Sequence, residues 1–206
     1  MTPFKTRPFL RNILASCALA AFCAATLPAQ GLASGPDHVA VASAYFEEKV
    51  APWLSAPQII EAIKAQNART AGLTQAEIDR LDQQWRSETQ TTKHTGPLIE
   101  SLMKKPVSVF VRDAFANTSF TIVEVIIMDA RGLNVGISTP TSDYWQGDEA
   151  KYQKTFQTGS RALFVDDLEF NSDVGLILAQ VNRTIFDPQT GQPIGAVTIG
   201  MNFNQL

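Results

Sequence analysis

One short segment gathers most of the side chains that could do chemistry. It runs from Thr139 to Phe156 and places seven aromatic or charged side chains within ten positions: Asp143, Tyr144, Trp145, Asp148, Glu149, Lys151 and Tyr152. Aromatic rings form rigid walls and can face a cation. A carboxylate can pair with a ligand amine, and a lysine ammonium can pair with a ligand carboxylate. The segment therefore predicts a ligand-binding site made by Asp143, Tyr144, Trp145, Asp148 and Lys151.

The same residues also fit structural roles, which remain alternatives at this point. Asp148 and Glu149 follow Gly147 and could open a helix, with Asp148 as its amino-terminal cap. Tyr144 and Trp145 could close the core beneath a loop. A calcium site is a further alternative, but the segment lacks the alternating oxygen ligands of an EF-hand loop. We expect no metal.

The usual catalytic constellations are missing from the sequence. His38 and His94 have no metal-ligand spacing to another histidine or cysteine. There is no nucleophile elbow, phosphate loop or dinucleotide-binding glycine pattern. We therefore expect no catalytic residue, no cofactor and no enzyme; a hydrolase that uses paired carboxylates is the enzymatic alternative.

The first 33 residues resemble an export signal. Lys5, Arg7 and Arg11 precede a stretch without charge, and Gly31-Leu32-Ala33 fits a small-residue cleavage site. The chain is then a periplasmic protein, exported by the general secretory route with its signal peptide (1–33) cleaved. An uncleaved anchor is the alternative, although the apolar run is shorter than the ~20 residues that a spanning helix needs. Cys17 and Cys23 both lie within this segment, so the mature chain would hold no cysteine.

Composition and charge restrict the class of the mature chain. The 206 residues are 45% apolar and 18% charged, which is typical of one globular domain plus a signal. Loss of three basic residues with the signal leaves 14 basic and 20 acidic ones, a net charge of −6. Such a chain is a poor match for nucleic acid, whose phosphates require Lys and Arg.

The apolar spacing divides one domain, 34–206, into a mainly helical part (34–116) and a strand-rich part (117–206). Helical spacing runs from Val39 to Val50 and ends at Pro52 and Pro57, and a second helix carries three isoleucines between 59 and 63. Thr74 and Glu77 form a capping box that opens a further helix.

Alternation of apolar and polar residues then predicts five strands, at 120–128, 134–138, 161–165, 175–185 and 194–203. They are joined by turns, so the sheet should be mainly antiparallel. The last strand alternates large apolar residues with Ala196, Thr198, Gly200 and Asn202. This second set faces either solvent or the floor of a pocket, because small side chains let a ligand approach the sheet.

Three runs of the chain resemble bacterial extracytoplasmic Cache domains, also called PDC sensor domains, of the single-domain type. The runs are MDARGLNVGISTPTSDYWQGDEAKYQKTF, FVDDLEF and IFDPQTGQPIGAVTIGMNF. The helical stretches 59–67 and 78–86 are also similar to this group. The resemblance covers Phe120 to Phe203 well.

The resemblance implies an α+β, PAS-like fold, with helices packed on one face of a mainly antiparallel five- to six-stranded sheet. Loops and a short helix on the other face would enclose a pocket for a small polar metabolite, such as an amino acid or a carboxylate. The sequence departs from the amino-acid-binding subgroup, because Ser142-Asp143, and no arginine, precede Tyr144-Trp145.

The function that follows is that of a periplasmic small-molecule-binding sensor-like domain in signal transduction. The sequence shows no output domain after Leu206, so we expect a separate membrane sensor or transporter as partner. A ligand-free protein-interaction accessory of an envelope kinase or transporter is the alternative. The resemblance also implies a homodimer formed through Val39 to Val50.

Overall fold

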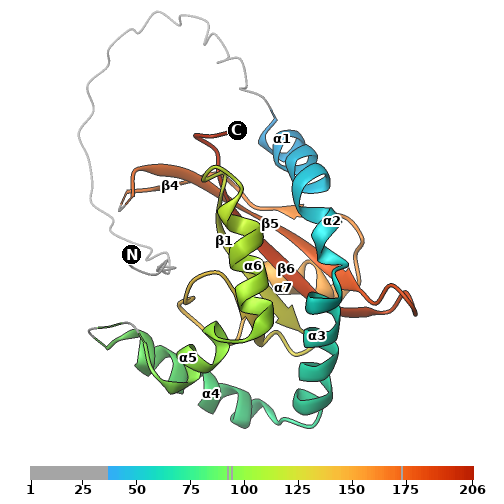
Figure 1. Ribbon diagram of the computed structural model, residues 1–206, viewed down its shortest axis with the longest axis vertical. Coiled ribbons are helices and arrows are strands. Elements are labelled where there is room, and N and C mark those ends of the chain that lie inside the picture. Colours follow the sequence, from blue (N-terminus) through green and yellow to red (C-terminus); the bar gives the residue numbers. More distant parts are fainter. Residues whose placement is uncertain (1–36, 92, 94, 173) are drawn as a thin grey trace, which may run out of the picture.

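Most of the described helices precede the strands in sequence, and two short ones lie between the second and the third strand. The computed structural model describes residues 37–91, 93, 95–172 and 174–206, and Figure 1 shows their arrangement. The segment predicted as a signal peptide and His94 lie outside the described residues. The helices are α1 (His38–Tyr45), the π-helical η1 (Phe46–Val50), α2 (Ala51–Leu54), α3 (Pro57–Thr70), α4 (Gln75–Thr89), α5 (Pro97–Met103), α6 (Pro106–Ala116), α7 (Ala150–Gln153) and the 3-10 helix η2 (Phe156–Thr158).

Local sequence signals set several helix boundaries. The predicted capping box is confirmed: the Glu77 carboxylate accepts from the Thr74 backbone N–H at 2.7 Å, and the Thr74 hydroxyl accepts from the Glu77 N–H. Pro57 opens α3, at a position where the missing N–H costs nothing. The expected interruption at Pro52 is wrong, because Pro52 lies in the first turn of α2 and the helical path continues to Leu54.

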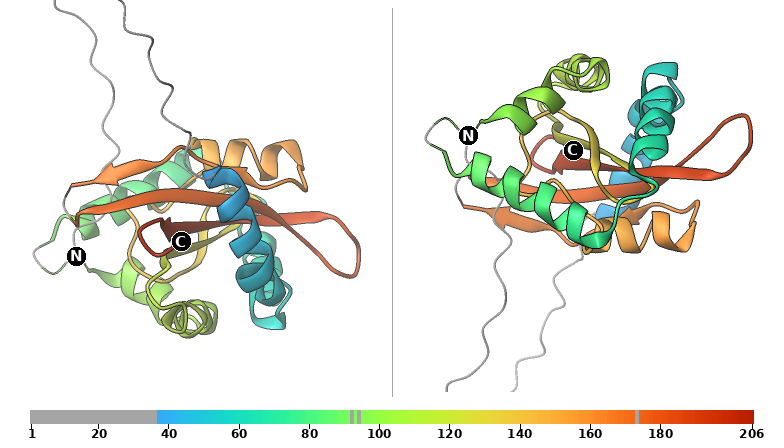
Figure 2. Two further views of the ribbon diagram at one scale, coloured as in Figure 1. Left: turned by 90° about the horizontal axis from the view of Figure 1, so that it is seen from above. Right: turned by 90° about the horizontal axis from the view of Figure 1, so that it is seen from below.

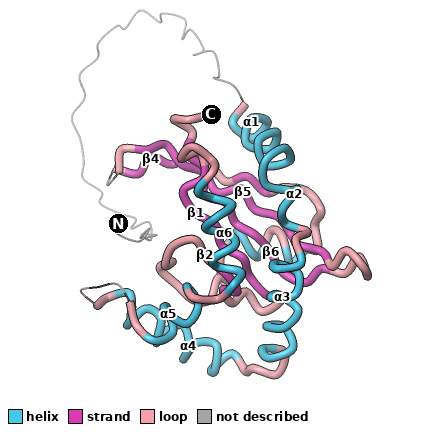
Figure 3. The backbone as a smooth tube through the Cα atoms, in the orientation of Figure 1, coloured by secondary structure: helices cyan, strands magenta, loops and turns pink. Residues whose placement is uncertain are grey.

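The strands form one antiparallel sheet in the order β2-β1-β6-β5-β3, and β4 also pairs with β5 (Figure 3). They are β1 (Ile122–Asp129), β2 (Asn134–Ile137), β3 (Phe164–Val165), β4 (Glu169–Asn171), β5 (Leu176–Phe186) and β6 (Pro193–Asn202). The predicted α+β class with an antiparallel sheet of five to six strands is confirmed. The sequence missed β4, since three residues are too few to show an alternating pattern.

One face of the sheet packs against the amino-terminal helices. Val197, Ile199 and Met201 of β6 are fully buried on this face. They share a core with α1, η1, α3 and α6, to which Phe46 and Ile63 contribute. Figure 2 shows α6 and the short α7 on opposite sides of the sheet. Each large apolar side chain buried in this way stabilises the fold by about 1.5–3 kcal/mol. The core fixes the sheet from one side, and the second face is left to α4, α7 and the loops.

The second face has two parts of different character. Toward the β1–β2 turn, Met128 and Ala196 are covered by Trp85 of α4 and by Tyr144 and Tyr152; we call this part the filled half. Farther along β6, the same face carries Thr198, Gly200 and Asn202, which alternate with the large apolar residues of that strand.

Those alternating positions do not face solvent. Thr198 and Asn202 are fully buried, and the Thr198 hydroxyl donates to the Asn182 side-chain oxygen at 2.7 Å. Gly200 lines a cavity. Of the two alternatives for this face, the solvent-exposed one is wrong, and the pocket floor is what the structure has.

None of the described helices has the length and apolar character needed to cross a membrane.

Candidate functional site

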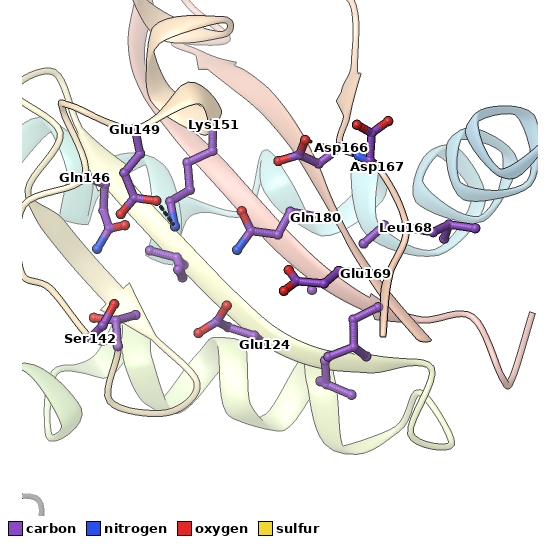
Figure 4. Close-up of a pocket in the computed structure, with 16 residues that line it drawn as sticks. Glu124, Ser142, Gln146, Glu149, Lys151, Asp166, Asp167, Leu168, Glu169 and Gln180 are labelled. Carbon is purple, nitrogen blue, oxygen red and sulfur yellow. Dashed lines mark hydrogen bonds and ion pairs between the residues drawn. The ribbon is translucent and has the colours of Figure 1, made fainter. Parts of the chain in front are cut away.

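A cavity of about 480 Å³ lies over the second face of the sheet, beside the filled half. Its walls come from β1, β5 and β6, from the segment before and within β4, and from the loop that leads into α7 (Figure 4). We call this part of the second face the hollow half. The residues that line it are Val123, Glu124, Ile126, Thr141, Ser142, Gln146, Glu149, Lys151, Asp166, Asp167, Leu168, Glu169, Leu178, Ala179, Gln180 and Gly200.

The floor of the cavity is one row of residues across three strands. Glu124 of β1 pairs with Gly200 of β6, and Gly200 pairs with Gln180 of β5. The central glycine leaves room between two long polar side chains. A Cβ atom added to Gly200 would lie 3.1 Å from the Glu124 Cβ, which is tighter than ordinary packing. The register of the sheet therefore creates a shallow polar floor.

Glu124 is a half-buried carboxylate on this floor. Burial raises the pKa of Glu124, and the nearby Glu149 charge raises it further, while Lys151 opposes both effects. Among the described residues, the Glu124 carboxylate has no ion pair and accepts no hydrogen bond. A carboxylate in this state gains from any donor or cation that enters the cavity.

Glu149 and Lys151 form an ion pair on the opposite wall. The Lys151 Nζ atom lies 3.0 Å from the Glu149 Oε2 atom, and the lysine side chain is only 8% exposed. Burial raises the pKa of Glu149, although Lys151 opposes this. Because an unpaired buried ammonium is costly, the pair is what permits Lys151 to lie inside. The ammonium is thus already engaged.

Gln146 contributes an acceptor that lacks a partner. Its side-chain nitrogen donates to the Asp143 carbonyl at 2.8 Å, which fixes the orientation of the amide. Its Oε1 atom is buried and has no hydrogen-bond partner among the described residues. Such an unsatisfied group costs about 1–3 kcal/mol, so it favours a donor in the cavity.

Of the five predicted ligand-binding residues, Lys151 lines the cavity and the other four do not. Asp143 forms an ion pair with Arg86 of α4 at 2.9 Å, and burial raises its pKa. Tyr144 stacks on Trp85 in the filled half, with ring centroids 5.4 Å apart. These two residues fix the loop against α4.

Trp145 and Asp148 also lie outside the cavity lining. The Trp145 indole N–H donates to the Arg131 carbonyl at 2.8 Å and covers the β1–β2 turn. Asp148 is exposed, and the cap of α7 is Glu149. The expected cap at Asp148 is therefore wrong by one residue, since the backbone enters the helix one position later.

Sequence reasoning missed the polar residues of the sheet and of the loop wall. Glu124 stands between apolar residues of β1, and Gln180 follows the apolar start of β5. A charged residue in the middle of a buried strand is a signal, because it must find a partner or face a hollow. Gln146 could not be recognised in this way, because its neighbours in the sequence are largely polar as well.

The carboxylates of the cavity are spread around its wall. In the part of the chain that the structure describes, no group of three His, Cys, Asp or Glu side chains could hold a metal ion. The expected absence of a metal stays a prediction, since no ligand of any kind is present to test it.

Comparisons with known proteins retrieve a similarity in structure only. A scan against protein-family models gives no match. A search of curated proteins gives none either. Among solved structures, the chain is similar to the sensor domain of the V. cholerae histidine kinase DctB, with 9% identity and a TM-score of 0.36. That superposition covers 80% of this chain and 50% of the DctB chain.

Two chemoreceptor domains give similar values. The ligand-binding domain of Campylobacter jejuni Tlp3, solved with 4-methylisoleucine, shows 10% identity and a TM-score of 0.37, covering 79% of this chain and 60% of that one. The domain of Pseudomonas aeruginosa PAO1 PctC, solved with GABA, shows 14% identity and a TM-score of 0.35, covering 80% and 62%. The chain thus spans about half to three fifths of the length of these three chains. The first is the sensor domain of a histidine kinase, and the other two are ligand-binding domains of chemoreceptors.

Proposed function

We propose that this chain is a periplasmic small-molecule-binding domain that acts in signal transduction through a separate membrane partner. The observation that carries the proposal is the hollow half of the sheet's second face. A cavity of about 480 Å³ falls in the size range of small-molecule sites. Its floor holds a half-buried carboxylate without an ion pair, and its wall holds an unsatisfied amide oxygen; a polar ligand would complete both. The periplasmic location rests on the sequence of residues 1–33.

The proposed role is binding and not catalysis. The polar groups of the cavity are carboxylates, amides, the Thr141 and Ser142 hydroxyls and a paired lysine, and no histidine or cysteine lines it. The Ser142 hydroxyl donates to the Asp143 carboxylate at 2.9 Å, and Asp143 is itself paired with Arg86. Such a wall can orient a ligand and complete its hydrogen bonds. A ligand in the cavity would contact both the loop before α7 and the sheet, and so would hold the loop against the sheet. A membrane partner could then recognise the surface of the ligand-bound form.

A thermal-shift screen of small polar metabolites tests the proposal. A ligand at about 100 times its dissociation constant stabilises a protein by about 2.7 kcal/mol. Gly200→Val should abolish the response, because its side chain would occupy the floor beside Glu124. Gly72→Val is the matched control, since Gly72 is exposed and has open space around its Cα atom. A ligand that stabilises Gly200→Val as strongly as the unaltered chain would show that it binds elsewhere.

A second candidate function is the ligand-free interaction accessory. Phe170 of β4 and Ile177 of β5 pair across the two strands, and both are exposed, at 65% and 38%. Leu168 and Val174 beside them are exposed as well. An apolar group of this kind at a sheet edge fits a protein partner. An empty metabolite screen, together with an envelope protein whose capture is lost in Phe170→Asp, would favour this function.

A further inference from the structure

The cavity wall carries much more negative than positive charge. One lining residue is a lysine and five are carboxylic acids: Glu124, Glu149, Asp166, Asp167 and Glu169. Lys151 is already paired with Glu149 at 3.0 Å. The wall therefore has a formal charge of −4 when all these groups are ionised, and a ligand carboxylate would find no free cation among the lining residues.

An independent feature calls for a hydrogen-bond donor at the same place. Gln146 is 1% exposed, and its Oε1 atom has no hydrogen-bond partner in the described chain. The amide cannot turn over without losing the bond from its nitrogen to the Asp143 carbonyl. In Figure 4 the Gln146 oxygen points to the side on which Glu124 lies. An ammonium N–H satisfies both this oxygen and a carboxylate.

The placement of the acids favours an organic cation over a metal ion. Glu124 stands on β1, Glu149 precedes α7 and Glu169 stands on β4, so they surround the cavity from three sides. Across the residues that the structure describes, no three such side chains come close enough to hold one ion. A calcium ion needs six to eight oxygens around one point. A molecule with nitrogen donors spread along its length matches the wall better.

We propose that the cavity binds a small organic ammonium compound, a mono- or diamine without a carboxylate, through Glu124 and Gln146. This rests on the proposed function, and it narrows the polar metabolite expected from the sequence. An amino acid would place its own carboxylate against an acidic wall. A diamine would place one nitrogen at Glu124 and Gln146 and the other toward Glu169.

The state of Glu124 gives this binding a pH dependence. Burial and the Glu149 charge raise the pKa of Glu124, and Lys151 opposes them. Glu169, Asp166 and the neutral Gln180 also line this cavity. Protonation removes the charge that attracts the cation, so affinity falls as the pH is lowered through the raised pKa. Binding near that pKa should release a proton, because the cation favours the ionised form.

Three four-carbon probes that differ only in end groups test the proposal with the purified full chain. They are the diamine putrescine, the zwitterion γ-aminobutyrate and the dicarboxylate succinate, measured by calorimetric titration at millimolar concentration. We expect putrescine to bind most tightly. Glu124→Gln should weaken it by about tenfold or more, the value of a charge-assisted hydrogen bond. Glu61→Gln, at an exposed glutamate of α3 outside the cavity lining, should leave it unchanged.

Each other outcome has a distinct meaning. If succinate or γ-aminobutyrate binds more tightly than putrescine and Gly200→Val removes that binding, the proposed function stands and the amine is wrong. If calcium chloride binds and Glu124→Gln removes it, the cation is a metal ion and the amine is again wrong. If no probe binds, the amine proposal is overturned, and the metabolite screen decides the proposed function separately.

Discussion

The filled and hollow halves of the sheet's second face are built by neighbouring residues of one loop, yet they have opposite properties. Tyr144 stacks on Trp85 and leaves no space, whereas Gln146, two positions later, lines a cavity. Asp82 of α4 accounts for the difference, because its carboxylate accepts from the Tyr144 and Trp145 backbone N–H groups at 2.8 and 3.0 Å. The comparison shows that a loop can use its aromatic residues as anchors and leave its polar residues for a ligand.

The largest effect should come from removing the centre of the filled half. Trp85 is fully buried, and its indole N–H donates to the Thr141 carbonyl at 2.8 Å. Trp85→Ala should lower the free energy of unfolding by about 3–5 kcal/mol, measured by urea denaturation. Trp53→Ala on the half-buried α2 is the matched control and should cost clearly less. Equal losses would mean that the filled half is no better packed than the surface.

A smaller effect is expected when the anchor of the loop is removed. Asp82→Ala leaves two backbone N–H groups without their acceptor and removes one of the two carboxylates that pair with Arg86, the other being Asp143. We expect a loss of about 1–3 kcal/mol in the free energy of unfolding. Asp79→Ala, at an exposed position of the same helix, should change it by only about 0.5 kcal/mol or less. The loop should also lose its fixed position, so putrescine binding should weaken although Asp82 does not line the cavity.

The smallest effect on stability should come from the hollow half. The pKa of Glu124 is raised in the folded protein, so the unfolded chain ionises first as the pH rises. Stability therefore falls between the ordinary pKa of a glutamate and the raised pKa of Glu124. In denaturation curves taken across this pH range, Glu124→Gln should remove the part of the fall in the free energy of unfolding that Glu124 causes. The control Glu61→Gln should show the same fall as the unaltered chain. If Glu124→Gln unfolded more easily than the unaltered chain at neutral pH, the Glu124 carboxylate would stabilise the fold, which would contradict the view that it serves a ligand.

The sequence predicted the elements better than the cavity. Alternation located five of the six strands, and the Thr74 capping box located the start of α4. Lys151 was also placed among the ligand-binding residues, and it does line the cavity. These features follow from the residue itself and its near neighbours.

The floor could not be predicted in the same way, because it depends on strand register. Glu124, Gln180 and Gly200 are far apart in the chain and meet only through the pairing of β1, β6 and β5. The roles of Tyr144 and Trp145 likewise depend on Asp82, some 60 positions earlier. Local sequence shows that the loop is rich in aromatic and acidic groups, but not which of them a helix elsewhere will bind.

Site-resolved amide shifts test the central claim, that the hollow half receives a small polar ligand, most directly. The ¹⁵N-labelled chain is titrated with putrescine, γ-aminobutyrate and succinate in turn. The account predicts that at least one probe shifts the amides of Glu124, Gln146 and Gly200 strongly, while those of Trp85 and Tyr144 in the filled half barely move. Shifts centred on the filled half, or on the smaller cavity of about 200 Å³ beside Arg183, would contradict it.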